Sequence, residues 1–307
     1  MPRKTDQRAL QETALRHFLE VAQTGSVTAA AERLHVAPSA VSRSIARLEE
    51  ALDTLLFERR ARGMHLNSAG ELLAVHARRA WQDIERVVAE IGSLRGLRSG
   101  NVRLASTEGL AAEFLPQLIA GFQRHYPGIR FMLEVCQQAD IPRLLRHGDM
   151  DIGLTFGTSS ERDIQVERRH AAPILAVVSP DHPLANRRQL ALAQLAGHAL
   201  ALPPPSSTLR QLFDISCTRQ GLSHDAALLC NRLDPAIAFA AAGGGVALCG
   251  ELAIRSRLQS GAVVGIALRD REMNERHFEV QTLAGRTLPS ACRAFLNHLN
   301  DLLQQEP

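Results

Sequence analysis

A short segment near residue 40 combines arginine and serine side chains at helical spacing. Pro38 fits the first turn of a helix, and the apolar residues that follow recur on one face: Val41, Ile45, Leu48 and Leu52. The opposite face carries hydroxyl and guanidinium groups: Ser39, Ser42, Arg43 and Arg47. Such groups contact phosphates and base edges when a helix lies in the major groove of DNA. The alternative is a small helical bundle whose outer face is only solvated.

Two further helices are predicted before this segment. The first carries an apolar stripe that ends at Gly25: Leu15, Phe18, Leu19 and Ala22. Ser26 fits the N-cap of a short second helix that reaches Leu34. The turn at 35–37 then gives the pair of helices the spacing of a helix-turn-helix. Ser26, Thr28 and Pro38 are therefore further candidate DNA contacts, while Arg43 would either read a guanine or hold a phosphate.

An arginine-rich turn follows the third predicted helix. Two apolar segments, at 55–57 and 64–66, flank a turn that contains Gly63, which predicts a β-hairpin. Three arginines lie in or beside that turn: Arg59, Arg60 and Arg62. Directly after a recognition helix, such a wing is placed to contact phosphates or the minor groove; the alternative is a solvated charged turn. The net charge of the 307-residue chain is only +3, so these arginines concentrate its positive charge locally.

A long helix with a heptad seam is predicted next, capped by Asn67 or Ser68. Its apolar residues step by four and three: Leu73, Ala77, Ala80, Ile84, Val87, Ile91 and Leu94. A seam of this kind indicates pairing with another helix; the alternative is an amphipathic helix packed within its own domain. Two glycines, Gly96 and Gly100, mark the end of this linker.

Strands and helices alternate from about residue 101 to the C-terminus, which predicts an α/β domain with mostly parallel sheets. The strands are expected at 102–105, 129–135, 151–156, 174–178, 198–202, 227–230, 246–248, 263–267 and 278–283. About 205 residues exceed one sheet, so we expect two subdomains with a cleft. The expected organisation is a DNA-binding domain at 1–67, a linker helix at 68–97 and an α/β domain at 98–307. Its subdomains are expected at 98–163 with 268–307, and at 164–267.

These residues resemble the LysR-type transcriptional regulators. The likeness is most specific over residues 15–70, in three motifs: Phe18-x-x-Val21-Ala22-x-Thr24-Gly25-Ser26-x-Thr28-Ala29-Ala30-Ala31, Ser39-Ala40-Val41-Ser42-Arg43-x-Ile45-x-x-Leu48-Glu49, and Leu56-Phe57-Glu58-Arg59 with Ala69-Gly70. Looser matches follow at Phe122-x-x-x-Tyr126-Pro127 and Gly148-x-x-Asp151-Ile152. Asp53 stands where the family often has glycine, Ala37 where a polar residue often precedes the proline, and Asn67-Ser68 where a threonine commonly caps the linker helix.

The resemblance implies a winged helix-turn-helix, a coiled-coil linker helix and a two-subdomain effector domain like the periplasmic binding proteins. It implies a regulator that binds an inverted-repeat operator as a homodimer or homotetramer and is modulated by a small effector in the cleft, with RNA polymerase as a further partner. It also makes Thr155 and Phe156 candidate pocket lining. Binding of the effector would shift the populations of two subdomain arrangements and so change the spacing and bending of DNA.

Serine and threonine follow two predicted strands where helices begin, and exposed N–H groups at such ends attract anions. One pair is Ser106 and Thr107. The other cluster precedes a helix with an arginine: Ser206, Ser207, Thr208 and Arg210. Across a cleft the two would clamp a small organic acid; the alternative is plain helix capping. Glu108 counts against a strongly anionic ligand, because its carboxylate already lies at the first of these helix starts.

Other classes of protein are less well supported. No nucleophile elbow, phosphate loop or HExxH motif is present, so no enzyme and no cofactor are expected. The N-terminus lacks an apolar signal segment and the longest uncharged run is too short to span a membrane, so we expect a cytoplasmic chain rather than an exported binding protein. Cys217 and Cys230 leave a redox sensor open, whereas Cys217, His224 and Cys230 match no compact zinc pattern, so no metal is expected.

Overall fold

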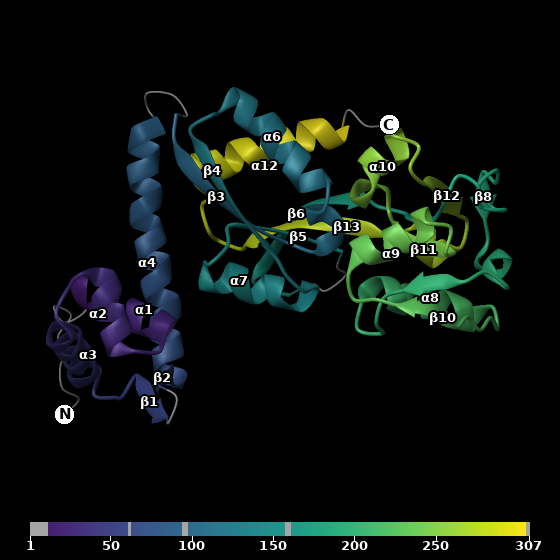
Figure 1. The fold of residues 1–307 in the computed structure, drawn as a ribbon. Helices are drawn as coiled ribbons and strands as arrows, with labels where there is room; N and C mark the ends of the chain where they lie inside the picture. The colour runs from purple at the N-terminus through teal and green to yellow at the C-terminus, as the bar shows by residue number, and fades with distance from the viewer. Residues whose placement is uncertain (1–11, 61–62, 94–97, 157–160, 305–307) are drawn as a thin grey trace. The chain divides into compact units, whose positions relative to one another are not determined.

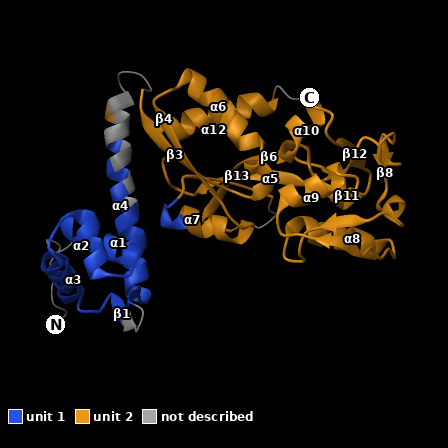
Figure 2. Cartoon of the chain, viewed as in Figure 1, with its two compact units in different colours: residues 1–88, 146–149 blue, residues 89–145, 150–307 orange. Residues whose placement is uncertain are grey.

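The computed structural model describes residues 12–60, 63–93, 98–156 and 161–304 (Figure 1). It divides into two compact units, one formed by residues 1–88 with 146–149 and the other by 89–145 with 150–307 (Figure 2). Among the described residues, no helix is both long and apolar enough to cross a membrane.

The first unit is helical with a small hairpin. Its elements are α1 (Glu12–Thr24), α2 (Val27–Leu34), α3 (Pro38–Leu52), β1 (Phe57–Arg60), β2 (Gly63–Leu66) and α4 (Ser68–Ser93). Local signals set these boundaries as expected: Gly25 adopts a φ of 66° after α1, and the hydroxyl of Ser26 accepts a hydrogen bond of 3.3 Å from Ala29 N–H at the start of α2. Asp53 adopts the left-handed φ of 49° at the end of α3, which an aspartate tolerates, so glycine is not required there.

The helices of this unit share one core. Phe18 and Val21 from α1 meet the buried face of α3, which presents Val41, Ile45 and Leu48. The rings of Phe18 and Phe57 lie 5.3 Å apart, so the hairpin packs on the same core. Because one face of α3 is fully used in this packing, its other face is left for solvent or a partner.

The second unit contains two mixed sheets. The first has the strand order β4-β3-β5-β13-β6, with bounds Ile129–Val135, Gly100–Ser106, Ile152–Thr155, His277–Leu283 and Ile164–Ala171. Strands β3, β4 and β5 are parallel, whereas β13 runs antiparallel to β5 and β6. Helices α6 (Phe114–His125) and α12 (Ser290–Gln304) cover one face and α7 (Ile141–His147) the other (Figure 1). This sheet and its helices are called the first lobe.

The second sheet has the order β10-β9-β11-β7-β12-β8, with bounds Ala226–Leu229, Leu200–Leu202, Val246–Gly250, Ile174–Val178, Val264–Leu268 and Gln189–Leu190. Helices α8 (Thr208–Arg219) and α11 (Arg271–Asn274) pack on one face, and α9 (Leu233–Ala241) and α10 (Arg255–Gln259) on the other. Shorter elements complete the unit: α5 (Glu108–Ala111) and the 3-10 turns η2 (Gln138–Asp140), η3 (Leu192–Leu195) and η4 (Glu251–Ala253). The second sheet and its helices are called the second lobe.

Two features differ from the expectations. Residues 164–171 form β6, which pairs with β13 from Ile164↔Leu283 to Ala171↔His277, so this segment belongs to the first lobe and not to the second. The chain therefore crosses between the lobes at Ala172–Pro173, and again between β12 and β13. The sheets are also mixed rather than mostly parallel, because β7 and β13 each run antiparallel to both of their neighbours.

Candidate functional sites

The outer face of α3 is open to solvent. All five of its predicted contact residues are exposed: Pro38, Ser39, Ser42, Arg43 and Arg47. The Arg43 Nε donates a hydrogen bond of 3.2 Å to the Ser39 carbonyl, so this guanidinium lies along the exposed helix surface without a carboxylate partner among the described residues. Hydroxyl and guanidinium groups thus share one accessible helix face, which is the arrangement needed to enter a major groove.

The start of α2 contributes less than expected. Thr28 is exposed, but Ser26 is half-buried and its hydroxyl caps the helix by accepting from Ala29 N–H. Ser26 therefore has the N-cap role that its position in the sequence predicts. Its position beside the exposed Thr28 still leaves the helix start accessible.

The hairpin predicted as a wing is present. Strands β1 and β2 pair antiparallel, with Arg59 opposite Met64 and Arg60 opposite Gly63. The N–H of Met64 donates to the Gly25 carbonyl over 2.9 Å, which fixes the wing against the end of α1. Arg62 and the side chains of Arg59 and Arg60 lie outside the described residues, so their DNA contacts stay a prediction.

The heptad seam of α4 divides into two parts. Ala77 is buried and Leu73 is half-buried against the core of the first unit, and Ala80 is half-buried. Ile84, Val87 and Ile91 are 49%, 46% and 63% exposed, which is unusual for large apolar side chains at helical spacing. Leu94 lies outside the described residues. The second half of the seam therefore presents an unpartnered apolar stripe.

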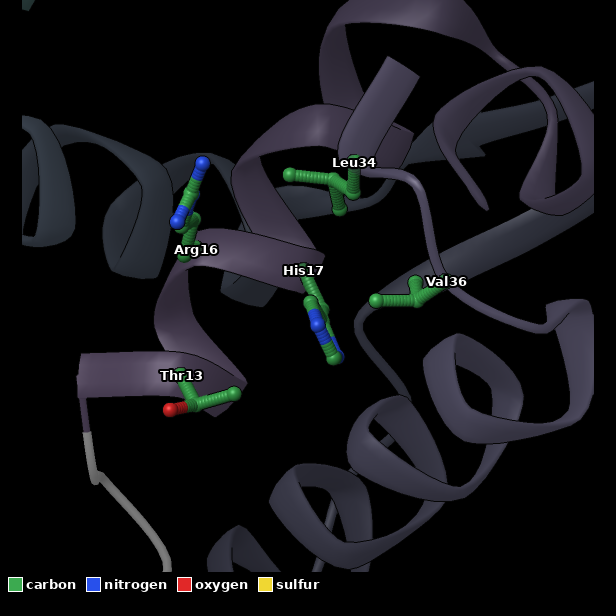
Figure 3. A pocket seen from close by; sticks show the side chains of 5 residues that line it. All are labelled: Thr13, Arg16, His17, Leu34 and Val36. Carbon is green, nitrogen blue, oxygen red and sulfur yellow. The ribbon is translucent and has the colours of Figure 1, made fainter. Parts of the chain in front are cut away.

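A small hollow lies between the start of α1 and the end of α2 (Figure 3). Its lining residues are Thr13, Arg16, His17, Leu34 and Val36. The His17 Nδ1 lies 2.8 Å from the Ser44 hydroxyl of α3, and burial, aided by the charge of Arg16, lowers the pKa of His17. The neutral imidazole joins α1 to α3, so the hollow belongs to the packing of the helix-turn-helix.

The first predicted effector cluster lies where β3 and β5 end. Ser106 and Thr155 are buried, and the Thr107 N–H donates to the Leu154 carbonyl over 3.2 Å, which sets the two strand ends side by side. The hydroxyl oxygens of Thr107 and Thr155 are shielded from solvent and have no hydrogen-bond partner in the described part of the chain. Buried hydroxyls are normally satisfied, so these two are candidate ligand contacts. Phe156 follows directly and is buried.

The second predicted cluster is mostly engaged in local contacts. The Ser207 hydroxyl accepts from Arg210 N–H over 3.1 Å and caps α8, while the Arg210 guanidinium is paired with Asp214 at 2.7 Å. The Thr208 hydroxyl reaches across to the first lobe and donates to Gln138 Oε1 over 2.5 Å. Ser206 is exposed. Arg210 is therefore not a free cation, and Thr208 is the member of this cluster that joins the lobes.

Sequence reasoning missed Arg276, which lies between α11 and β13. Its guanidinium carbon lies 3.4 Å from the centroid of the Phe156 ring, and its carbonyl accepts a hydrogen bond of 2.7 Å from Ala172 N–H. Burial lowers the pKa of Arg276 to about 9. No sequence motif marks this arginine, because its position depends on two strand crossings about one hundred residues apart.

The cysteines offer little support for redox or metal chemistry. Burial raises the pKa of Cys217 to about 11, which leaves little thiolate at neutral pH, and Cys136 is raised to about 11 for the same reason. In the described ranges, no group of three histidine, cysteine or acidic side chains could hold a metal ion. The redox hypothesis for Cys217 and Cys230 is therefore weakened.

Two family models account for nearly the whole chain. The model of the LysR substrate binding domain matches residues 95–304, and that of the bacterial regulatory helix-turn-helix protein, lysR family, matches residues 13–71. The chain belongs to the LysR family of transcriptional regulators. This LysR-family chain is 32% identical over 238 residues to the transcriptional dual regulator GltC of Bacillus subtilis, with 77% of this chain and 79% of the relative covered.

Solved structures of LysR-family proteins share the fold. A cysteine-to-aspartate variant of full-length OxyR from Pseudomonas aeruginosa superposes with a TM-score of 0.75 at 19% identity and covers 94% of both chains. CbnR in complex with its target DNA gives a TM-score of 0.64 at 19% identity and covers 95% of this chain and 99% of CbnR. The predictions of the family, of the helix-turn-helix followed by an α/β effector domain, and of a transcriptional regulator rather than an enzyme are confirmed. LysR-family regulators bind operator DNA and small-molecule effectors.

Proposed function

We propose that this regulator binds an inverted-repeat operator as a dimer, with one α3 in the major groove of each half-site. The exposed hydroxyl and guanidinium face of α3 carries the proposal, because the opposite face of the same helix is buried. The wing arginines Arg59, Arg60 and Arg62 supply phosphate or minor-groove contacts, and they are duplicated in a dimer. The working compartment is the cytoplasm, where the chromosome lies, and bound RNA polymerase is the partner through which transcription is altered.

Selection of bound fragments from a random DNA library by the purified full-length protein tests the operator. We expect an inverted repeat whose half-sites lie about one helical turn, or a multiple of it, apart. Binding should weaken steeply with salt, since log K falls by about 0.9 per neutralised phosphate for each unit of log salt. Fragments without any shared sequence, or with a single asymmetric site, would contradict the dimeric arrangement.

The exposed stripe of α4 supports the dimer. Ile84, Val87 and Ile91 continue the seam that Leu73 and Ala77 begin, and pairing with a second helix would bury these exposed side chains. Further association of two dimers into a tetramer gives four α3 helices on one stretch of DNA. The linker helix of a second copy of this chain is the partner that the seam fits.

The effector lies between the lobes, where the strands of both sheets end. The unpartnered hydroxyls of Thr107 and Thr155 and the contact of Thr208 with Gln138 support this placement. A ligand that binds one lobe arrangement more tightly shifts its population and thereby changes DNA spacing and bending. A thermal-shift screen of metabolites on the full chain identifies binders. If the footprint and bend angle stay the same with every compound that binds, this coupling is wrong.

A further inference from the structure

Arg276 occupies the place where the two crossings between the lobes meet. It precedes β13, and its carbonyl accepts a hydrogen bond of 2.7 Å from the N–H of Ala172, which precedes β7. Both crossings are thus joined at this residue. Because β13 runs antiparallel to β5, Arg276 lies at the carboxyl end of β5.

The guanidinium lies between one strand end from each lobe. Its carbon is 3.4 Å from the centroid of Phe156, the residue that follows β5 of the first lobe. A Cβ placed on Gly250, the last residue of β11 in the second lobe, would lie 3.6 Å from Nη1. A cation–π contact uses none of the N–H donors of the guanidinium, and the Arg276 Nε has no acceptor in the described part of the chain.

Arg276 is half-buried and lacks an anionic partner in the described part of the chain. Its Nε is shielded from solvent and has no hydrogen-bond acceptor, and no carboxylate pairs with it in the described part of the chain. Burial lowers the pKa of Arg276 to about 9. Elsewhere in the same domain the buried carboxylate of Asp151 is paired with both Arg103 and Arg286. A partly desolvated cation without a counter-ion is costly, and an unpaired charge of this kind is a candidate ligand-binding group.

Two acidic groups near the lobe boundary, Glu108 and Glu113, are already engaged. The Glu108 carboxylate accepts a hydrogen bond of 3.1 Å from Leu233 N–H at the start of α9. Glu113 accepts from Ser256 N–H over 2.6 Å and lies 3.9 Å from the Arg257 guanidinium. Neither carboxylate neutralises Arg276. The objection that Glu108 would repel an anionic ligand is weakened, because its charge is directed to a helix N-terminus.

We propose that Arg276 is the anion-binding residue of the effector site and that the effector is a small carboxylate. The inference rests on the proposed function of the domain and assigns the ligand class and its anchor. A carboxylate fits because its two oxygens match two parallel N–H donors at the edge of a guanidinium. One unpaired positive charge beside the Phe156 ring suits a singly charged ligand with an apolar body.

The test compares carboxylates with their neutral amides on the full-length protein. Acetate and acetamide, benzoate and benzamide, and inorganic phosphate are the probes, read by thermal shift and by calorimetric titration. We expect at least one carboxylate to raise the Tm by several degrees, with no shift from its amide. Arg276→Gln should lower the affinity for that carboxylate more than tenfold, Arg276→Lys less, and Arg293→Gln, at an exposed arginine of α12, should leave it unchanged.

Ligand-free stability separates a binding role from a structural one. If Arg276 serves to bind an anion, Arg276→Met removes an unpaired, half-buried charge, and the ligand-free Tm should stay the same or rise by a few degrees. A fall of the Tm in both Arg276→Met and Arg276→Gln, or unfolding of both, would assign the arginine to structure and overturn the proposal. Equal binding of carboxylate and amide, equal affinity in Arg276→Gln, or no carboxylate binding to the wild type would overturn it as well.

The proposed function is judged by a different measurement. Sequence-selective DNA binding by the wild type is measured on the same preparation without any probe. If the protein binds DNA selectively but the carboxylate experiments fail, only the assignment of Arg276 is rejected. Absence of selective binding rejects the proposed operator function, whatever the carboxylates do.

Discussion

Asn67 and Gly70 form the junction between the wing and the linker helix: the Asn67 Oδ1 accepts a hydrogen bond of 2.9 Å from the Gly70 N–H. The other half of the same amide donates from Nδ2 to the Leu55 carbonyl over 2.7 Å. One side chain therefore caps α4 and holds the segment that enters β1. A Cβ on Gly70 would collide with the Leu56 carbonyl, so a glycine is needed for α4 to start this close to the segment.

Asn67→Ala should destabilise the first unit by about 1–2 kcal/mol, because it removes a helix cap and the bond to Leu55. Ser68→Ala is the matched control, since Ser68 is exposed and is the first residue of α4 rather than its cap. Urea unfolding followed by the fluorescence of Trp81, the only tryptophan and a residue of α4, measures both. Equal midpoints for the two variants would show that the cap adds nothing.

Arg43→Ala should weaken operator binding by about 1–3 kcal/mol if the guanidinium reads a base. In that case the affinity for random DNA changes little. A phosphate contact instead predicts equal losses of affinity for the operator and for random DNA. Titration of operator and random duplexes at one fixed salt concentration distinguishes the two roles. No loss on either duplex would remove Arg43 from the interface, in spite of its exposed position on α3.

Ile84→Glu should weaken the dimer about tenfold or more, the equivalent of roughly 1.4 kcal/mol, because it sets like charges against each other in the seam. Ile215→Glu is matched in residue type and exposure, with 47% of Ile215 and 49% of Ile84 accessible, but lies on α8 of the second lobe. Sedimentation equilibrium of the wild type and both variants gives the dissociation constants. A dimer that resists Ile84→Glu, or one that Ile215→Glu disrupts equally, would argue against this seam.

The boundaries of the N-terminal helices could be predicted because their signals are local. Ser26, Pro38 and Gly25 each act within one turn of the element that they start or stop. Strand β6 could not be predicted in the same way. Its sequence, Ile164–Ala171, contains two arginines, a glutamate and a histidine, and its burial pattern is that of a half-exposed sheet edge. Its partner β13 lies more than one hundred residues later.

The candidate sites likewise include residues that local sequence patterns reveal and residues that only the tertiary structure reveals. The exposed face of α3 follows from helical periodicity, so its residues could be named from the sequence. Arg276 could not, because what distinguishes it is the lack of a carboxylate partner among the described residues, together with the nearby Phe156. Arg210 illustrates the converse. An arginine after a serine cluster predicted an anion clamp, but Asp214, one helical turn later, forms an ion pair with the Arg210 guanidinium.

Acidification should destabilise the first unit through His17. Burial lowers the pKa of His17 in the folded chain, whereas an unfolded histidine protonates near pH 6.5. The folded state thus binds fewer protons, so its stability is complete above about pH 6.5 and falls as the pH drops from there toward the lowered pKa. Trp81 fluorescence during thermal unfolding between pH 8 and 5 measures the effect. His17→Gln should flatten the pH dependence, while His65→Gln, at an exposed position of β2, should leave it unchanged. An identical slope in wild type and His17→Gln would show that other titratable groups carry the acid sensitivity of the first unit.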